Sequence, residues 1–234
     1  MTEETRLNEW FVPKFGPAKF RMFVGLLFLP YTGMCISFAV IGSLLPQHIQ
    51  WERTEAISLI YALAPGISAH VADSIGSKKV KPWGTLFSKK QLVVIMLSSL
   101  VAAYSVGFYY ILLYAPVLSI IAVLEGFFLI AYNFELFSGR FHNDFWFAVS
   151  WGTLPLLAGF IIQTNSVNLL AATVSVCTGI VSYAEIRLSR PYKMLMKTLA
   201  EPKRTKMLEK GLKSLSIGTI TFGLATIAYR IIFS

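Results

Sequence analysis

Residues 68–82, which read SAHVADSIGSKKVKP, join the end of an apolar run to a group of polar and charged side chains. The apolar run begins near Ala56. His70 and Asp73 are three positions apart and Ser77 is four further on, so on a helix all three would share one face. Lysines follow at positions 78, 79 and 81. An acid and an imidazole at the mouth of an apolar helix, with cations just outside, predict a site for an anionic head group.

The composition of the chain is that of an integral membrane protein. Of its 234 residues, 55% are hydrophobic and only 14% are charged, whereas soluble domains carry roughly 25% charged residues. The formal net charge of +9 would suggest a nucleic-acid partner if the protein were soluble. Here the cations are confined to a few loops, which is typical of membrane topology, so we expect no nucleic-acid partner.

The hydrophobic pattern predicts seven membrane-spanning helices in a single domain, residues 1–234. A span needs roughly 20 apolar residues. The segments that qualify are 21–45, 55–75, 91–108, 110–131, 145–163, 167–186 and 213–233. The third and fourth are almost contiguous, so we expect a tight hairpin around residues 108–110. The fold class is therefore all-α, a multi-pass membrane helical bundle.

The basic segment between the last two spans, residues 192–213, allows two interpretations. Methionines and leucines alternate with its cations, and Pro202 divides it into two short pieces. It would lie on the membrane surface as broken amphipathic helices. Alternatively, it is an ordinary basic loop over anionic lipid.

The placement of basic residues predicts the orientation of the chain. Almost all of the 21 Lys and Arg residues lie before the first span, or in and beside the loops that follow spans two, four and six. The two exceptions are Arg53 and Arg230. Because Lys and Arg accumulate in cytoplasmic loops, this asymmetry places the N-terminus in the cytoplasm and the C-terminus outside. Residues 68–82 would then face the cytoplasm.

The same stretch resembles a metal-binding motif of the UbiA superfamily of intramembrane prenyltransferases. The motif of that family reads Asn-Asp-x-x-Asp-x-x-x-Asp-Arg-x-x-Lys-Pro and stands at the end of the second span. Residues 69–82 agree with it in length and position, in the central Asp73, in the basic Lys78 and in the pair Lys81-Pro82. They depart from it at the positions of one Asn and two Asp, which are here Ala69, His70 and Ser77.

A second resemblance to the superfamily lies after the fourth span. The family has a Tyr, a short loop with a basic residue, and a helix with a Trp/Phe-Gly-x-x-Pro pattern and a later Gly. Here Tyr132 is followed by Arg140 and by residues 151–159, WGTLPLLAG. The second Asp motif of the family would close span six, where this chain has Glu185, Arg187, Ser189 and Arg190. The last two spans of the family have no counterpart, so the resemblance covers roughly residues 15–230.

The resemblance implies transfer of an isoprenoid chain from a prenyl diphosphate to an aromatic or lipid acceptor. Asp73 and His70 would be catalytic. Asp73 and Glu185 would hold Mg²⁺, for which one or two carboxylates can suffice. The residues that would bind the diphosphate are Lys78, Lys81, Arg140, Arg187 and Tyr132. The partners implied are membrane lipid and the prenyl diphosphate substrate.

Plain structural roles are also open for several of these residues. Lysines that follow a span are more often topology signals than ligands. Asp73 would in that case be a helix-end residue that faces water. We expect His142 and Asp144 to cap the fifth apolar segment, since Asn143 and Asp144 directly precede it.

A different class of function is open as well. The protein would be a non-catalytic membrane protein that binds lipid or diphosphate, or a subunit of a membrane complex with a protein partner. Glu125 lies well inside the span 110–131, where the family motifs do not explain it. An ionisable residue there must be protonated, paired or facing a cavity. A small transporter that uses Glu125 is a weaker interpretation, because the spans show no internal repeat.

Overall fold

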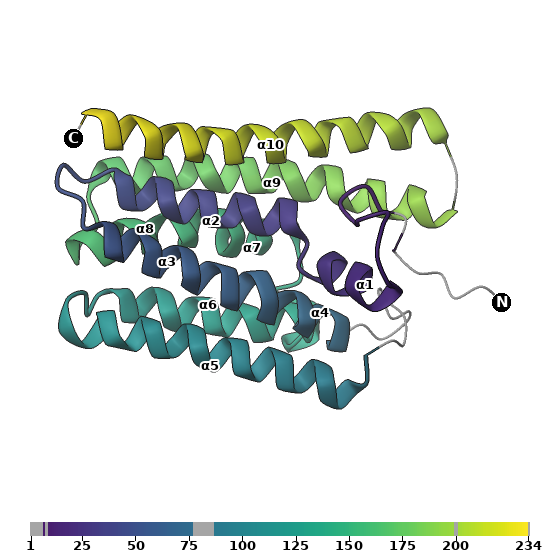
Figure 1. Ribbon diagram of the computed structural model, residues 1–234, viewed down its shortest axis with the longest axis horizontal. Helices are drawn as coiled ribbons and strands as arrows, with labels where there is room; N and C mark the ends of the chain where they lie inside the picture. The colour runs from purple at the N-terminus through teal and green to yellow at the C-terminus, as the bar shows by residue number, and fades with distance from the viewer. Residues whose placement is uncertain (1–6, 8, 77–86, 199–200, 234) are drawn as a thin grey trace.

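The computed structural model describes residues 7, 9–76, 87–198 and 201–233, and in this part of the chain every regular element is a helix (Figure 1). The elements are α1 (Ala18–Leu26), α2 (Leu29–Leu44), α3 (Trp51–Leu63), the π-helix η2 (Ala64–Ala69), α4 (His70–Gly76), α5 (Lys89–Leu113), α6 (Leu118–Asn133), the 3-10 helix η3 (Phe137–Gly139), α7 (Asp144–Ala148), the π-helix η4 (Val149–Thr153), α8 (Leu154–Thr164), α9 (Leu169–Thr198) and α10 (Pro202–Phe233). The all-α fold class is confirmed.

Each predicted span overlaps a helical segment, although the bounds differ by several residues. Within the described residues, the segments long and apolar enough to cross a membrane are Ala18–Leu44, Trp51–Gly76, Lys89–Leu113, Asp144–Thr164, Leu169–Thr198 and Pro202–Phe233. The remaining predicted span corresponds to α6, a shorter apolar helix of 16 residues. These lengths and compositions are those of a multi-pass membrane helical bundle.

The predicted hairpin around residues 108–110 is wrong. Helix α5 continues to Leu113, and the turn lies at residues 114–117. Pro116 explains the position, because a proline has no amide hydrogen and disfavours the helical conformation of the residue before it, Ala115. The Ala115 amide instead donates to the carbonyl of Tyr110 at 2.8 Å.

The interpretation of residues 192–213 as an ordinary loop is wrong, whereas their position on the membrane surface stays a prediction. Helix α9 continues to Thr198, and α10 begins with Pro202. A proline is well tolerated at the first position of a helix, where its missing amide hydrogen would have no partner in any case. The basic segment therefore forms the extended ends of two long helices.

The helices form layers (Figure 1). α9 and α10 lie along one side of the bundle, and α5 and α6 lie along the opposite side. α2, α3 and α8 lie between them, and α2 packs against α3, α8 and α10. α1 and the C-terminal end of α10 lie at opposite ends of the bundle.

Helices α2 and α8 approach so closely that their crossing requires glycine. A Cβ atom on Gly159 would overlap the carbonyl oxygen of Ala39, and one on Gly42 would overlap that of Leu156. Small residues let membrane helices come this close, which strengthens their packing. The glycine that ends the sequence WGTLPLLAG thus packs the middle layer of the bundle.

The first span is interrupted after α1. Phe28 has a positive φ of 44°, a conformation that non-glycine residues adopt at an energetic cost. Pro30 follows in the first turn of α2, where it cannot donate a hydrogen bond. The Thr32 hydroxyl donates to the carbonyl of Leu27 at 2.6 Å and so satisfies a group at the break. The break leaves the ring of Phe28 stacked on His70, with centroids 5.1 Å apart.

Two π-helical segments interrupt other spans. η2 contains Pro65 and Gly66, and η4 directly precedes the turn that holds Pro155. A proline ring clashes with the carbonyl four residues earlier, so the regular hydrogen-bond pattern cannot pass through it. The wider π-helical turn accommodates this clash, and such turns are frequent at functional sites.

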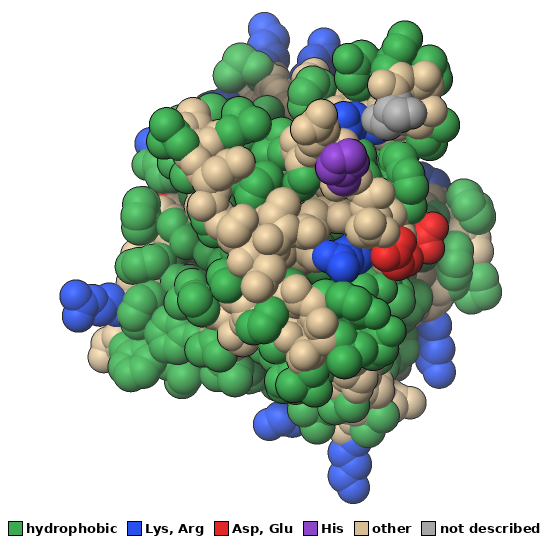
Figure 2. Space-filling view, turned by 90° about the vertical axis from the view of Figure 1, so that its left-hand side faces the viewer, with side chains coloured by type: hydrophobic (Ala, Val, Ile, Leu, Met, Phe, Trp, Pro, Cys, Tyr) green, Lys and Arg blue, Asp and Glu red, His purple; other side chains and the backbone are tan. Residues whose placement is uncertain are grey.

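The end of the bundle that carries the C-terminus has few charges. Figure 2 shows hydrophobic side chains, uncharged polar side chains and backbone over most of this end, with a histidine and a few acidic and basic groups among them. Arg53 donates to the carbonyl oxygens of Ile162 and Gln163 at 3.2 and 3.1 Å, in the last turn of α8, where helix carbonyls lack partners. Arg230 donates to the carbonyl of Gln47 at 2.9 Å. Arg53 and Arg230, the two cations that depart from the asymmetric distribution of Lys and Arg, therefore stabilise a helix end and a loop.

Candidate functional site

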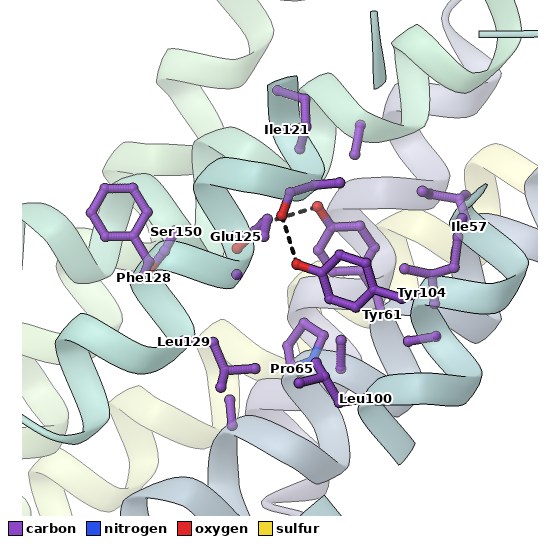
Figure 3. A pocket seen from close by; sticks show the side chains of 18 of the residues that line it. Ile57, Tyr61, Pro65, Leu100, Tyr104, Ile121, Glu125, Phe128, Leu129 and Ser150 are labelled. Carbon is purple, nitrogen blue, oxygen red and sulfur yellow. Dashed lines mark hydrogen bonds between the residues drawn. The ribbon is translucent and has the colours of Figure 1, made fainter. Parts of the chain in front are cut away.

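A long apolar pocket lies between α3, α5, α6 and α8 (Figure 3). It encloses about 870 Å³, including space that opens outward. Its wall follows α6 from Leu118 to Asn133, and both π-helical segments contribute to it, through residues such as Pro65 and Trp151. Glu125 is the only Asp, Glu, Lys or Arg among the described residues that line the pocket. The pocket is therefore suited to a hydrophobic ligand.

Aromatic side chains surround His70 at one end of the pocket. Trp151, which lines the pocket, has its ring centroid 5.0 Å from that of His70, and Phe28 stacks on His70 as well. The Nε2 atom of His70 lies 3.3 Å from the hydroxyl of Thr32. The ammonium group of Lys193 lies 5.0 Å from the centre of the Phe28 ring, within the range of a cation–π interaction. The histidine thus packs against the first and fifth spans, with a cation of α9 nearby.

Two arginines of α9 meet Asp144 beside Tyr132, which lines the same end of the pocket. Arg190 Nη1 lies 2.9 Å from Asp144 Oδ1, and Arg187 Nη1 lies 3.7 Å from Asp144 Oδ2. Arg190 is also within hydrogen-bonding reach of the Tyr132 hydroxyl, and Asp73 is close to that hydroxyl. The side chain of Asp144 is 18% exposed, whereas those of Arg187 and Arg190 are 65% and 41% exposed. The guanidinium groups therefore remain open to an anionic ligand.

Glu185 is more deeply buried than the two arginines, on the face of α9 that packs against η4. Its exposed fraction is 2%, and its Oε1 atom has no hydrogen-bond partner among the described residues. Lys193 is close enough to interact with it electrostatically. Ser182, one turn earlier, is also buried, and its hydroxyl lies where a side chain at Gly152 would begin. A buried carboxyl oxygen without a partner is able to accept a proton donor or a cation.

The structure brings four of the predicted site residues to one end of the pocket. His70 and Asp73 belong to α4, which begins where η2 ends. Tyr132 lies at the end of α6 and Arg187 in α9. They meet because α4, α6 and α9 all reach this end of the bundle, although these residues are far apart in the chain.

Of the other predicted diphosphate-binding residues, the structure describes only Arg140. Arg140 is exposed in the loop that precedes α7, and among the described residues no contact of its guanidinium is found. Lys78 and Lys81 lie outside the described residues, as does Ser77. Their roles stay predictions.

The predicted metal ligands are Asp73 and Glu185. In the part of the chain that the structure describes, no three His, Cys, Asp or Glu side chains gather in a group that could hold a metal ion. Mg²⁺ keeps several waters and is often held by one or two carboxylates. A magnesium site at these two residues therefore stays a prediction.

The role of Asp144 differs from the expected helix cap. Asn143 caps α7 instead, because its Oδ1 atom accepts a hydrogen bond from the Trp146 amide at 3.0 Å. Asp144 follows in the first turn and pairs with the two arginines of α9. No local pattern predicts this pairing, because α7 and α9 belong to different spans and are separated in the chain by η4 and α8.

Glu125 lies near the middle of the pocket wall, and sequence reasoning missed its neighbours. The Tyr61 hydroxyl of α3 donates to Glu125 Oε1 at 2.9 Å. The Tyr104 hydroxyl of α5 donates to the carbonyl of Ala122, in the turn of α6 before Glu125, at 2.8 Å. Figure 3 shows both tyrosines directed toward this turn of α6. The three side chains come from three helices, so no sequence spacing links them.

The geometry thus combines an apolar pocket with an end that carries aromatic, acidic and basic side chains. The apolar part and the charged part adjoin each other at Tyr132 and Trp151. None of the models of protein families, the curated proteins or the solved structures compared with this chain matches it.

Proposed function

We propose that this protein is a UbiA-like membrane prenyltransferase, which transfers an isoprenoid chain from a prenyl diphosphate to an aromatic or lipid acceptor. The observation that supports the proposal is an apolar pocket that ends beside two arginines and a tyrosine. One amphiphilic ligand would occupy both parts. In this proposal the charged end of the pocket faces the cytoplasm and the C-terminus lies outside, in agreement with the distribution of Lys and Arg.

The apolar pocket is suited to the isoprenoid chain. From Leu118 to Tyr132 the wall formed by α6 extends for roughly 20 Å, at a rise of about 1.5 Å per residue. Burial of the chain would contribute roughly 0.8 kcal/mol for each CH₂ group. In this proposal, burial of the chain in the pocket therefore contributes most of the binding free energy. The charged end of the pocket positions the bond that reacts.

The arginines are suited to the diphosphate. Guanidinium groups bind phosphate oxygens through paired, charge-assisted hydrogen bonds. Asp144 already holds Arg187 and Arg190 together, so part of the ordering that binding requires is done in advance. His70 would donate a further hydrogen bond to a phosphate oxygen from its place beside Trp151.

The transfer requires that the leaving group be stabilised. The bond between the first carbon of the chain and the diphosphate oxygen breaks, and its electron pair leaves with the diphosphate. The acceptor then forms a bond to that carbon and releases a proton. Asp73 and Glu185 would hold Mg²⁺, and the unpartnered Oε1 atom of Glu185 fits this role. Bound Mg²⁺ supplies neutralisation of the diphosphate charge.

A non-catalytic lipid or diphosphate binder is the second candidate, and one observation favours it. Ala69 stands where the UbiA motif has an asparagine, and it is 7% exposed and lines the pocket. An alanine there contributes to binding of the chain and offers no polar ligand. The same pocket and arginines would then hold a lipid without breaking a bond, for instance in a subunit of a membrane complex.

The proposal is tested with purified protein, labelled geranylgeranyl diphosphate, Mg²⁺ and a membrane lipid extract. We expect binding, release of diphosphate and a labelled lipid product. Asp73→Asn should lower the rate of diphosphate release roughly tenfold, the effect of one lost charge-assisted interaction. Glu55→Gln, which changes an exposed carboxylate at the opposite end of the bundle, should leave the rate unchanged. Binding without release would favour the second candidate, and absence of binding would overturn both.

Filling the pocket should weaken binding of the chain. Gly107 lines the pocket, and a Cβ atom there would meet only Ile60 Cδ1, at 3.9 Å. Gly107→Leu is thus accommodated, but it occupies pocket space, and we expect affinity for geranylgeranyl diphosphate to fall about tenfold or more through lost burial. The matched control is Gly218→Leu in α10, where nothing lies within 4 Å. Equal affinities of the two variants in an equilibrium binding assay would contradict this use of the pocket.

A further inference from the structure

Glu125 places a carboxyl group in the wall of an otherwise apolar pocket. Tyr61 is the hydrogen-bond partner found for it among the described residues, and this bond uses Oε1 alone. Oε2 has no hydrogen-bond partner among the described residues. It is also not one of their side-chain oxygens that are both unpartnered and fully buried. The side chain is partly exposed because it lines the pocket. Oε2 is therefore accessible to a ligand in the pocket.

A carboxyl oxygen without a hydrogen-bond partner, such as Oε2 of Glu125, is energetically unfavourable in an apolar environment. Tyr104 does not relieve it, because its hydroxyl donates to the carbonyl of Ala122. The short polar side chains of the wall, Ser150 and Asn133, donate to the carbonyls of Phe147 and Leu129 at 3.3 and 2.8 Å. A hydrogen-bonding group on the ligand would satisfy the free oxygen of Glu125.

The chemistry of the wall indicates what kind of group this is. An ammonium ion would have to leave water for an apolar pocket, which is unfavourable even when the ion is paired. A neutral hydroxyl group loses much less on transfer, and it can both donate to and accept from a carboxyl group. The hydroxyl of Tyr61 already interacts with Glu125 in this way.

We infer that the pocket takes a hydrophobic ligand that carries a hydroxyl group, and that Glu125 binds this hydroxyl through its free carboxyl oxygen. The site is separate from the arginines, because Glu125 lies about two helical turns of α6, roughly 10 Å, from Tyr132. The inference depends on the pocket and not on the diphosphate chemistry. It assigns a function to the one carboxylic acid found in the pocket wall within the described residues.

The test uses two probes that differ by one hydroxyl group, tritiated 1-tetradecanol and tritiated tetradecane. Their binding is measured on protein in nanodiscs, with binding to empty nanodiscs subtracted. We expect the wild-type protein to bind the alcohol about tenfold more tightly than the alkane, the effect of one hydrogen bond to a carboxyl group. Neither probe carries a phosphate, so the result is independent of the proposed prenyl transfer.

Variants of the pocket wall assign the preference to Glu125. Glu125→Leu should bind the two probes equally and retain affinity for tetradecane, whereas Glu125→Gln should keep most of the preference because an amide also accepts and donates. Ser150→Ala, which removes another polar group of the same wall, should leave the preference unchanged. A preference that persists in Glu125→Leu, or a wild-type protein that does not discriminate, would overturn the inference.

A measurement on the wild-type protein covers the case in which Glu125→Leu fails to fold. Dicyclohexylcarbodiimide reacts with accessible carboxyl groups in apolar surroundings, and the modified peptide is identified by mass spectrometry. We expect modification of Glu125, with 1-tetradecanol protecting it at about a tenth of the concentration that tetradecane requires. Equal protection by the two probes, or no modification of Glu125, would count against the inference.

Discussion

Replacement of Arg190 by glutamine should lower the affinity for geranylgeranyl diphosphate about 100-fold, the effect of losing one guanidinium from a charge-paired site. Arg190 lies between Asp144 and Tyr132 at the end of the pocket, so it is the arginine nearest to where the diphosphate would lie. The fold should be retained, because a partly exposed ion pair contributes little to stability. Equilibrium binding of the labelled diphosphate in detergent or nanodiscs measures the effect.

Two controls distinguish an effect on binding of the diphosphate from an effect on binding of the isoprenoid chain. Geranylgeraniol has the same chain without the diphosphate, and its affinity should be unchanged by Arg190→Gln. Arg204→Gln removes a different arginine, which is paired with Glu201 at 3.3 Å on α10, and it should not affect binding of either compound. A parallel loss for the diphosphate and the alcohol would show that Arg190 acts on the fold of the pocket instead of on the anion.

Replacement of Gly159 by alanine should destabilise the bundle strongly. The added methyl group would overlap the carbonyl oxygen of Ala39, and backbone cannot move aside as a flexible side chain can. Helices α2 and α8 would have to separate, and overpacking of this kind costs about 3 kcal/mol. For a chain of this size we expect the midpoint of thermal unfolding to fall by roughly 5–10 °C.

The matched control for this change is Gly218→Ala in α10, where the added methyl group meets nothing within 4 Å. Alanine is a better helix former than glycine, by up to about 1 kcal/mol. The control should therefore unfold at the same temperature as the wild type or slightly above it. A Gly159→Ala protein that is as stable as the control would disprove the close approach of α2 and α8.

The helices were predictable from the sequence because a membrane leaves few alternatives. Long apolar segments must satisfy their own backbone hydrogen bonds there, and a helix does so. Pro116 also signals the turn between α5 and α6, whereas the prediction of a boundary at the aromatic residues 108–110 is wrong. Phe108, Tyr109 and Tyr110 instead continue α5, since nothing in them prevents a helix.

The site was only partly predictable, because its members meet through tertiary packing. His70 and Asp73 could be assigned to one helical face from their spacing. The contact of Asp144 with Arg190 and that of Tyr61 with Glu125 join separate spans. The sequence pattern of a single span carries no information on which face of another span it will meet. Phe28 has a positive φ, and this conformation places its ring against His70. In the sequence, only the nearby Pro30 indicates that the helix is interrupted here.

The π-helical segment η2 determines how α4 is rotated about the axis of the second span. Each residue of an α-helix turns the chain by roughly 100°, and a π-helical turn contains one residue more than an α-helical turn. Removal of a single residue from the range 64–69 would therefore rotate His70 and Asp73 by roughly 100° about that axis, while α3 and Tyr61 kept their positions. Loss or gain of one residue in this segment would thus decide whether the pocket has a polar end, without a change to His70 or Asp73 themselves.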